Sequence, residues 1–181
     1  MNSLAVYFGL GSNRGDRLAR LEEAVSRLDA VFGTPCEAIS SVLETEPLGL
    51  FQPEDGGAPA PFLNAVCRYR VPEAGQDARL HALWILSQAK AVERAMGRTD
   101  QPAFLPDGRR LYHSRNIDID LLLYGELRMR TPVLTLPHPR MAQREFVMIP
   151  LREVAMPETL ASFPEIFPEN DYFCRTEQIR P

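Results

Sequence analysis

The chain has 181 residues, of which 45% are hydrophobic and 24% are charged. This length suits one domain that buries roughly 70% of the surface of its unfolded form, and the composition argues against disordered, collagen-like and membrane classes. The net charge of -4 provides no broad attraction for nucleic acid. We therefore expect a soluble single domain over residues 1–181, with no nucleic-acid or membrane partner.

The three cysteines are far apart in the sequence and form no CxxC pair. They predict neither a disulfide framework nor a zinc site. The N-terminal residues contain no basic stretch and only a short apolar run, so they resemble neither a signal peptide nor a membrane span. Together these features predict a cytoplasmic protein.

The first elements are a strand over Leu4–Leu10, which enters a glycine-rich turn at Gly9–Asn13, and then a helix. Asp16 is placed to cap that helix and Gly33 to end it. Apolar residues recur along the helix at steps of three and four: Leu18, Leu21, Val25, Leu28 and Phe32.

A second strand is expected within Cys36–Glu44, and a third at Phe62–Val71, after a loop rich in proline and glycine. A second helix follows over Asp77–Met96, and after the loop Thr99–Ser114 comes a strand at Ile117–Tyr124.

Arg128–Leu136 could return as the hairpin partner of Ile117–Tyr124, and prolines break the remainder into short helical pieces. This order of elements predicts an α+β fold, a ferredoxin-like sandwich with a mostly antiparallel sheet and helices packed on it.

Asp118 and Asp120 form the strongest chemical signal. In a strand, residues i and i+2 face the same way, so both carboxylates project together while Ile117, Ile119 and Leu121 face the core. Two neighbouring carboxylates suit Mg²⁺, which prefers oxygen ligands and is often held together with substrate phosphates. Two acids alone are more often a solvated strand face.

Arginines beside the acids shift that balance. Arg115 lies three residues before Asp118, and Arg98, Arg109 and Arg110 precede it around a loop. Guanidinium groups can hold phosphate oxygens with two hydrogen bonds at once, so metal and arginines together indicate phosphoryl transfer. Any single arginine could instead balance the acids on the surface.

His138 stands between two prolines, where a stiff backbone can aim the imidazole at a ligand, although a lone histidine is more often structural. We expect His81 and His113 at the surface. The stretch Gly9–Gly15 misses the GxGxxG spacing by one residue and the chain has no GxxxxGK sequence, so neither a dinucleotide fold nor a P-loop is predicted.

Six short motifs occur in one order over roughly residues 4–155. They are Gly11-Ser12-Asn13; Pro47-Leu48-Gly49; Phe62-Leu63-Asn64; Glu93 with Gly97-Arg98; Arg115 to Asp120; and Pro137-His138-Pro139 with Arg144 and Phe146. In this combination they resemble the 6-hydroxymethyl-7,8-dihydropterin pyrophosphokinases of folate biosynthesis. The resemblance implies a ferredoxin-like fold, ATP as co-substrate, two Mg²⁺ ions, and transfer of pyrophosphate from ATP to the pterin with release of AMP.

The resemblance also implies roles by matching position. Asp118 and Asp120 would hold both metal ions and, with Arg98 and Arg115, form the catalytic set. Asn64 would hydrogen-bond the pterin ring between Phe62 and Phe146. The pterin residues would be Thr45, Leu48, Phe62, Asn64 and Phe146; those around ATP would be Glu93, Arg98, Arg110, Arg115, His138 and Arg144.

Three departures from the family pattern stand out. Lys90 occupies a position where members often carry glutamine, and Thr99–Ser114 is longer than usual and lacks the common tryptophan and glycine-proline. Tyr112 could substitute for the tryptophan by stacking. The tail 157–181 matches poorly, and we expect it either to cover the core or to extend a surface.

Two other functions use the same residues. A two-metal phosphodiesterase or nuclease would employ the acids and the histidine on a polynucleotide, which the acidic balance of the chain disfavours. A catalytically silent protein that binds pterin or nucleotide is disfavoured by the intact Asp118, Asp120 and Arg115. The chain is expected to act as a monomer.

Overall fold

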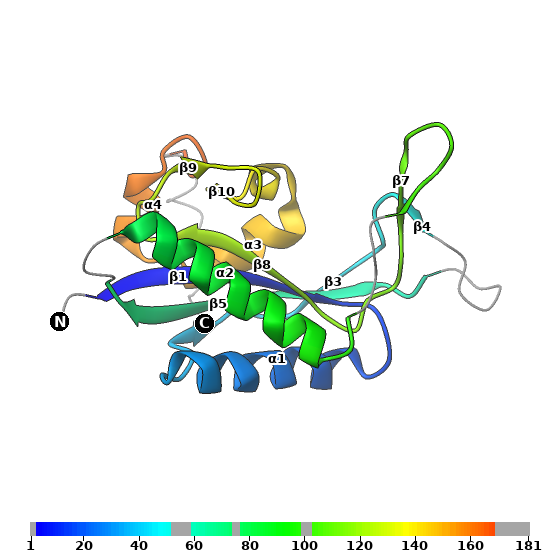
Figure 1. The fold of residues 1–181 in the computed structure, drawn as a ribbon, viewed down its shortest axis with the longest axis horizontal. Coiled ribbons are helices and arrows are strands. Elements are labelled where there is room, and N and C mark those ends of the chain that lie inside the picture. Colours follow the sequence, from blue (N-terminus) through cyan, green and yellow to red (C-terminus); the bar gives the residue numbers. More distant parts are fainter. Residues whose placement is uncertain (1–2, 52–58, 74–76, 99–102, 169–181) are drawn as a thin grey trace, which may run out of the picture.

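The computed structural model of the protein describes residues 3–51, 59–73, 77–98 and 103–168. Five antiparallel strands form its main sheet, in the order β2-β5-β1-β8, with β3 also paired to β5 (Figure 1). The strands are β1 (Ser3–Ser12), β2 (Ala38–Ile39), β3 (Leu43–Thr45), β5 (Phe62–Pro72) and β8 (Asp118–Tyr124). The α+β prediction with a mostly antiparallel sheet is confirmed.

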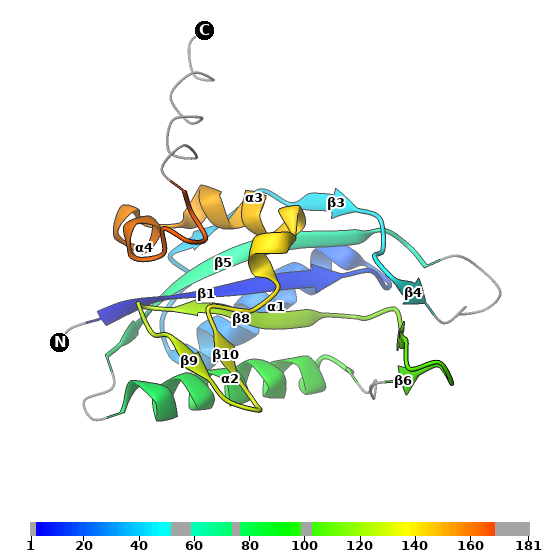
Figure 2. The same cartoon turned by 90° about the horizontal axis from the view of Figure 1, so that it is seen from above.

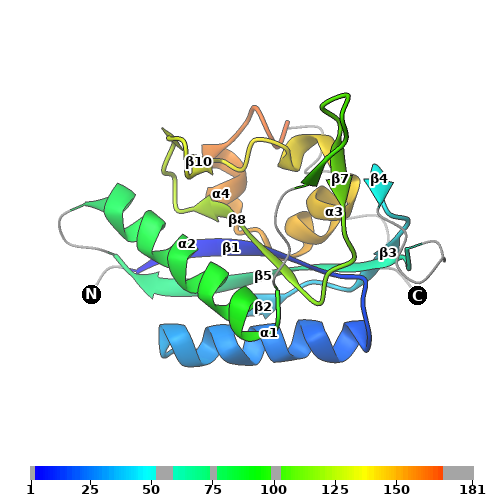
Figure 3. The ribbon, with the colours of Figure 1, turned by 45° about the vertical axis from the view of Figure 1, so that its right-hand side comes forward.

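Helices pack on both faces of this sheet. The first two share one face and the last two, with a short 3₁₀ turn, share the other; Figure 3 shows α1 and α3 on opposite sides of the strands. Their bounds are α1 (Arg17–Phe32), α2 (Ala78–Ala95), η1 (Met141–Gln143), α3 (Glu145–Val154) and α4 (Pro157–Ser162). Among the described residues, no helix is long and apolar enough to cross a membrane.

The ends of α1 follow the sequence signals. The Asp16 carboxylate accepts a hydrogen bond from the Ala19 N–H at 3.1 Å, and Gly33 ends the helix with φ 65°. This left-handed conformation is easily reached only by glycine. Of the periodic apolar residues, Leu21 and Leu28 are buried, whereas Leu18 in the first turn is 49% exposed.

Alternation along β1 divides its side chains between two hydrophobic clusters. Val6 and Phe8 pack toward α1 and α2, while Tyr7 packs toward α3 and α4. The second cluster also buries Phe163 and Phe167, so the tail from Pro157 to residue 168 covers the core. The rest of the predicted tail, residues 169–181, lies outside the described residues.

Three sequence predictions about strands are wrong. The strand β1 continues through Gly9 and Gly11, where we expected a turn. The segment Cys36–Glu44 contains two short strands, because the Ser40 hydroxyl takes up the Val66 N–H between them at 2.9 Å.

The third concerns the hairpin of β9 (Met129–Arg130) and β10 (Thr135–Leu136), whose strands pair with each other and not with β8. Pro132 lacks an N–H, so this stretch cannot form a continuous ladder along β8.

The two long loops meet in a second small sheet. Its strands are β4 (Leu50–Phe51), β6 (Ala103–Phe104) and β7 (Arg110–Tyr112), with β7 in the middle. Gly49 precedes β4 with φ 100°, and a Cβ there would lie 2.9 Å from the Tyr112 ring. Glycine is thus required for this close contact, and the two loops are joined by β4–β7 pairing.

Candidate active site

Two glycines of β1 form the floor of a pocket at one end of the main sheet. Gly11 lies opposite Asn64 of β5 and also opposite Asp118 of β8. A Cβ on Gly11 would lie 3.5 Å from the Asn64 Oδ1 and 3.9 Å from the Asp118 Cβ. The missing side chain therefore leaves a space between an amide on one strand and a carboxylate on the other. Gly9 repeats this arrangement one step further, opposite Asp120.

One wall of the pocket carries the residues predicted to bind a pterin. All five line it: Thr45, Leu48, Phe62, Asn64 and Phe146. Asn64 is 6% exposed, and its Nδ2 donates to the Thr45 Oγ1 at 2.9 Å and to the Leu43 carbonyl at 3.4 Å. These bonds fix the carboxamide with its Oδ1 toward the Gly11 floor. The wall is thus a narrow slot with one oriented polar group.

The opposite wall contains the two predicted acids. The Asp118 carboxylate accepts hydrogen bonds from Arg98 at 2.5 Å and from Arg115 at 2.7 Å, on different oxygens. Burial alone would raise its pKa, but the charges of Arg115 and Arg98 outweigh burial and lower the pKa to about 2. Asp118 is therefore ionised at neutral pH. The alternation is as predicted, because Ile117 and Ile119 are fully buried on the other face.

Side chains of α2 cover the outer edge of β8, along which that helix runs (Figure 2). The buried Glu93 carboxylate accepts from the Ile119 N–H at 2.5 Å, while the Lys90 ammonium donates to the Ile119 carbonyl at 2.8 Å. They replace the hydrogen bonds of a missing neighbouring strand. The Lys90 Nζ also lies 2.8 Å from Glu93 and 3.5 Å from Asp120.

Charge alternates through this group. Glu93 bonds Arg98 at 2.8 Å, and Arg98 in turn bonds Asp118. Burial raises the pKa of Glu93. For Lys90, burial acts to lower the pKa, but Asp120 and Glu93 outweigh it and raise the pKa. Glu93 and Arg98 thus lie behind the two acids and support them, and they are not among the described residues that line the pocket.

His138 and Arg144 reach the pocket from the segment between β10 and α3. The His138 N–H donates to the Leu122 carbonyl at 2.9 Å, which fixes the residue beside β8. Burial lowers the pKa of its imidazole despite the nearby Asp120, so the neutral form is favoured. The Arg144 guanidinium lies 5.6 Å from the centre of the Phe146 ring.

The donor set suits a magnesium ion that is shared with a phosphate. Within the ranges that the structure describes, no group of three or more histidine, cysteine, aspartate or glutamate side chains could hold a metal. Asp118 and Asp120 supply two hard oxygen ligands, and Mg²⁺ in proteins commonly takes one or two carboxylates, with phosphates and waters completing its shell. An ionised carboxylate has about four acceptor positions, so the arginines leave room for a metal on Asp118.

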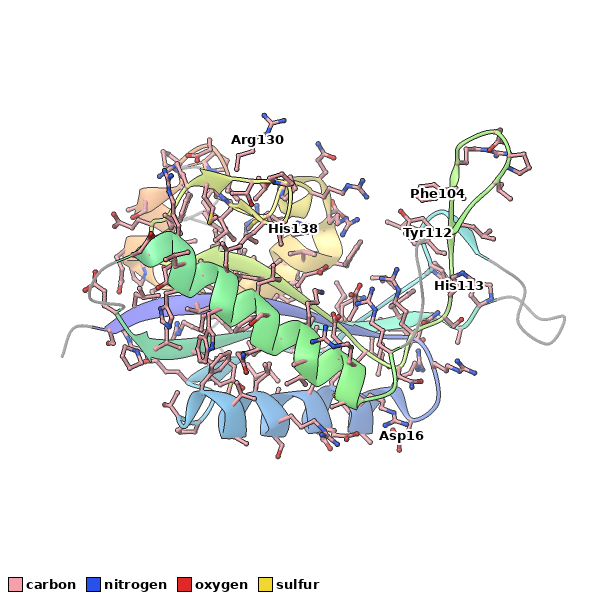
Figure 4. All side chains as sticks on the ribbon, viewed as in Figure 1. Asp16, Phe104, Tyr112, His113, Arg130 and His138 are labelled. Carbon is pink, nitrogen blue, oxygen red and sulfur yellow. The ribbon has the colours of Figure 1, made fainter. Side chains whose placement is uncertain are left out.

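Sequence reasoning missed two residues of the pocket. His113 was predicted at the surface but lines the pocket with Tyr112, and both lie on the arm formed by β7 (Figure 4). His138 is the labelled histidine on the opposite side. The other expected surface histidine, His81, is half-buried and pairs with the Tyr124 hydroxyl at 2.6 Å. For Arg110 the backbone is described but the side chain is not, so its predicted role falls outside the described part.

An apolar slot beside two arginine-supported carboxylates, on an antiparallel α+β sandwich, is the arrangement of a phosphoryl-transfer enzyme that acts on a flat substrate. Residues 7–156 match the model of the family described as 7,8-dihydro-6-hydroxymethylpterin-pyrophosphokinase (HPPK). The chain belongs to this family.

Relatives named 2-amino-4-hydroxy-6-hydroxymethyldihydropteridine pyrophosphokinase include one from Porphyromonas gingivalis, 40% identical over 83% of this chain and 90% of its own. Another, from Bacillus subtilis, is 34% identical over 85% of this chain and 79% of its own. The chain also resembles a quarter of a longer protein of Pisum sativum, named a mitochondrial folate synthesis bifunctional protein; identity there is 37% over 82% of this chain and 25% of that protein.

Proposed function

We propose that this protein transfers the β,γ-pyrophosphoryl group of ATP to the hydroxymethyl oxygen of 6-hydroxymethyl-7,8-dihydropterin, in folate biosynthesis. The new bond forms between that oxygen and the β-phosphorus, the bond from the β-phosphorus to the bridging oxygen of AMP breaks, and the hydroxyl proton is lost. The family match over residues 7–156 and the names of the relatives support this reaction.

The observation that carries the proposal is the register of three strands. Asn64, Gly11 and Asp118 stand side by side across β5, β1 and β8. A flat heterocycle on the glycine floor would meet the amide at one edge and direct its substituent toward the acids at the other. This placement favours transfer, because a bound alcohol beside a bound phosphate needs little further ordering.

On the pterin side, Asn64 recognises the ring with its Oδ1, while Phe62 and Phe146 stack on its two faces. Thr45 and Leu48 complete the slot. The Thr45 hydroxyl holds the Asn64 amide in the orientation that this recognition needs. Offset stacking of an aromatic ring on a flat ligand contributes about 0.5 to 1.5 kcal/mol beyond the buried area.

On the phosphate side, Asp118 and Asp120 would hold two Mg²⁺ ions. Bound Mg²⁺ supplies charge neutralisation across the phosphates. Arg115 and Arg98 keep Asp118 ionised and offer donors for phosphate oxygens, and Arg110 belongs to the same proposed set. Glu93, His138 and Arg144 are assigned to the nucleotide, with Glu93 acting through the edge of β8 that it covers.

The test is AMP formation that depends on both substrates. Purified protein with ATP, Mg²⁺ and the hydroxymethyl-dihydropterin should release AMP and form the pterin diphosphate, and omission of the pterin should stop both. Release of ADP, or hydrolysis of a polynucleotide in place of AMP release, would refute the proposal. Neither the phosphodiesterase nor the silent binding protein is favoured by the family match. A single domain, a monomer and a cytoplasmic location remain part of the proposal.

A further inference from the structure

Asn13 lies just past the end of β1, and it is 2% exposed. Its backbone N–H donates to the Arg115 carbonyl at 3.1 Å, and its side-chain Oδ1 accepts from the Arg115 N–H at 2.7 Å. The last paired residues of the two strands are Gly11 and Asp118. The carboxamide therefore extends the hydrogen bonding between these chain segments beyond the end of the ladder, up to the residue that supports Asp118.

The other end of the same carboxamide holds a different segment. The Asn13 Nδ2 donates to the Ala60 carbonyl at 3.2 Å and to the Ser114 Oγ at 3.3 Å. Chemistry sets this orientation, because the Arg115 N–H needs an acceptor and the Ala60 carbonyl needs a donor. Ala60 lies two residues before Phe62 at the start of β5.

One buried side chain thus joins the backbone behind both walls of the pocket. On one side it fixes Arg115, whose guanidinium bonds Asp118 at 2.7 Å. On the other side it fixes the chain that leads into Phe62. Both contacts span large sequence separations, so they set a distance between the walls that no local structure could set.

We infer that Asn13 is a positioning residue for the reaction, which sets the spacing between the Phe62 wall and the Arg115–Asp118 wall. The inference rests on the proposed function. Its reason is geometric: reacting groups held about 1 Å out of place can cost about a hundredfold in rate. Asn13 touches neither substrate in this role and acts only through the backbone that it bonds.

Two substitutions separate the two halves of this role. Asn13→Asp keeps an oxygen for the Arg115 N–H but loses the donor to Ala60 and places a second carboxylate oxygen against that carbonyl. The KM for the pterin should rise about tenfold, which is the order expected for a lost hydrogen bond, while kcat stays within about threefold. Asn13→Ala releases both walls, so kcat should also fall, by about a hundredfold.

Arg17→Met serves as the matched control. The Arg17 guanidinium donates to the Pro61 carbonyl at 2.8 Å, next to the bond from Asn13, and lies 3.5 Å from Glu44. It supports the same segment without contacting Arg115. Its loss should raise the pterin KM by less than about threefold and leave kcat unchanged, since the Ala60 bond remains.

Hydrogen exchange of the Arg115 amide gives a readout that needs no turnover. It should be slow in wild type and in Asn13→Asp, and fast in Asn13→Ala. Equal exchange in all three proteins overturns the inference, as does a folded Asn13→Ala with normal kcat and KM. If the wild type forms no AMP, the proposed function fails by itself, and the exchange comparison still decides whether Asn13 fixes the Arg115 backbone.

Discussion

The two halves of β1 have the same backbone pairing but opposite uses. From Ala5 to Phe8 the side chains fill both hydrophobic clusters, and Val6, Tyr7 and Phe8 are all fully buried. From Gly9 onward the strand keeps its partners β5 and β8, yet on the α3 side it presents two glycines. The difference teaches that side-chain volume, and not the ladder, decides where this sheet is core and where it is a pocket.

The packed half should therefore show its worth as stability. Phe8 is fully buried, with its ring 5.7 Å from the Phe32 ring and 6.0 Å from the Tyr69 ring. We expect Phe8→Ala to lower the free energy of unfolding by about 3–5 kcal/mol, because it leaves a cavity in a closely packed cluster. Denaturant unfolding measures this loss. Kinetic constants of the folded fraction should stay near normal; a change in pterin KM as large as that of the pocket variants would contradict the comparison.

The acids of the open half should show their worth as turnover. We expect Asp118→Asn and Asp120→Asn to lower kcat by about 10²–10³-fold, the order seen when one charge-stabilising group is removed from an active site. Either protein should still fold, because both side chains lie on the pocket face. AMP formation at saturating Mg²⁺ is the measurement. Near-normal rates in either variant would remove the support for a two-metal site.

How far the sequence predicts this molecule depends on whether the signal is local. The caps of α1 at Asp16 and Gly33, and the alternation that separates Asp118 from Ile119, are set by neighbouring residues and were predicted correctly. Periodicity identifies the face of a helix but not whether a neighbour covers each turn. Leu18 and Leu80 were counted as apolar stripe residues, yet they are 49% and 65% exposed.

Long-range pairing explains what the sequence could not provide. Tyr112 and His113 reach the pocket because three-residue β7 pairs with β4, some 60 positions earlier in the chain. Such short strands carry almost no periodic signal. Glu93 matched a family motif, but its bond to the edge of β8 could not be deduced from spacing. A glycine at 49 with φ 100° was the only local hint of a close approach there.

Gly11 offers the most direct way to turn the open half into the packed half. In Gly11→Ala the new Cβ would lie 3.5 Å from the Asn64 Oδ1 and 3.7 Å from Phe62, which are ordinary contact distances. The fold should therefore tolerate the methyl group, with little change in thermal midpoint. Pterin affinity should fall by about 10- to 100-fold, since one methyl group occupies the floor on which the ring would lie.

Calorimetric titration with the pterin and an ATP analogue measures this change. Gly33→Ala is not a suitable control, because its φ of 65° adds backbone strain. Gly9→Ala is suitable, since its new Cβ would meet only the Leu122 side chain at 3.5 Å or more. If both alanine variants bind pterin normally, the glycine floor is not the binding surface.

The smallest effect, and the one that divides the comparison most finely, concerns Phe62 and Phe146. Both line the pocket, but only Phe146 also packs against the α3-side cluster, so it belongs in part to the core. Phe62→Ala should weaken pterin binding roughly tenfold, through lost stacking and buried area, with little loss of stability.

Phe146→Ala should weaken pterin binding by a similar factor and also lower the free energy of unfolding, by less than the ~3–5 kcal/mol of a fully buried phenylalanine. Titration of the pterin and denaturant unfolding of both variants give the two quantities. Nucleotide affinity should stay unchanged, because neither ring belongs to the proposed phosphate side. A Phe146→Ala protein that loses stability but binds pterin normally would assign this ring to the core alone, and the boundary between packed and open surface would then run between Phe146 and Phe62.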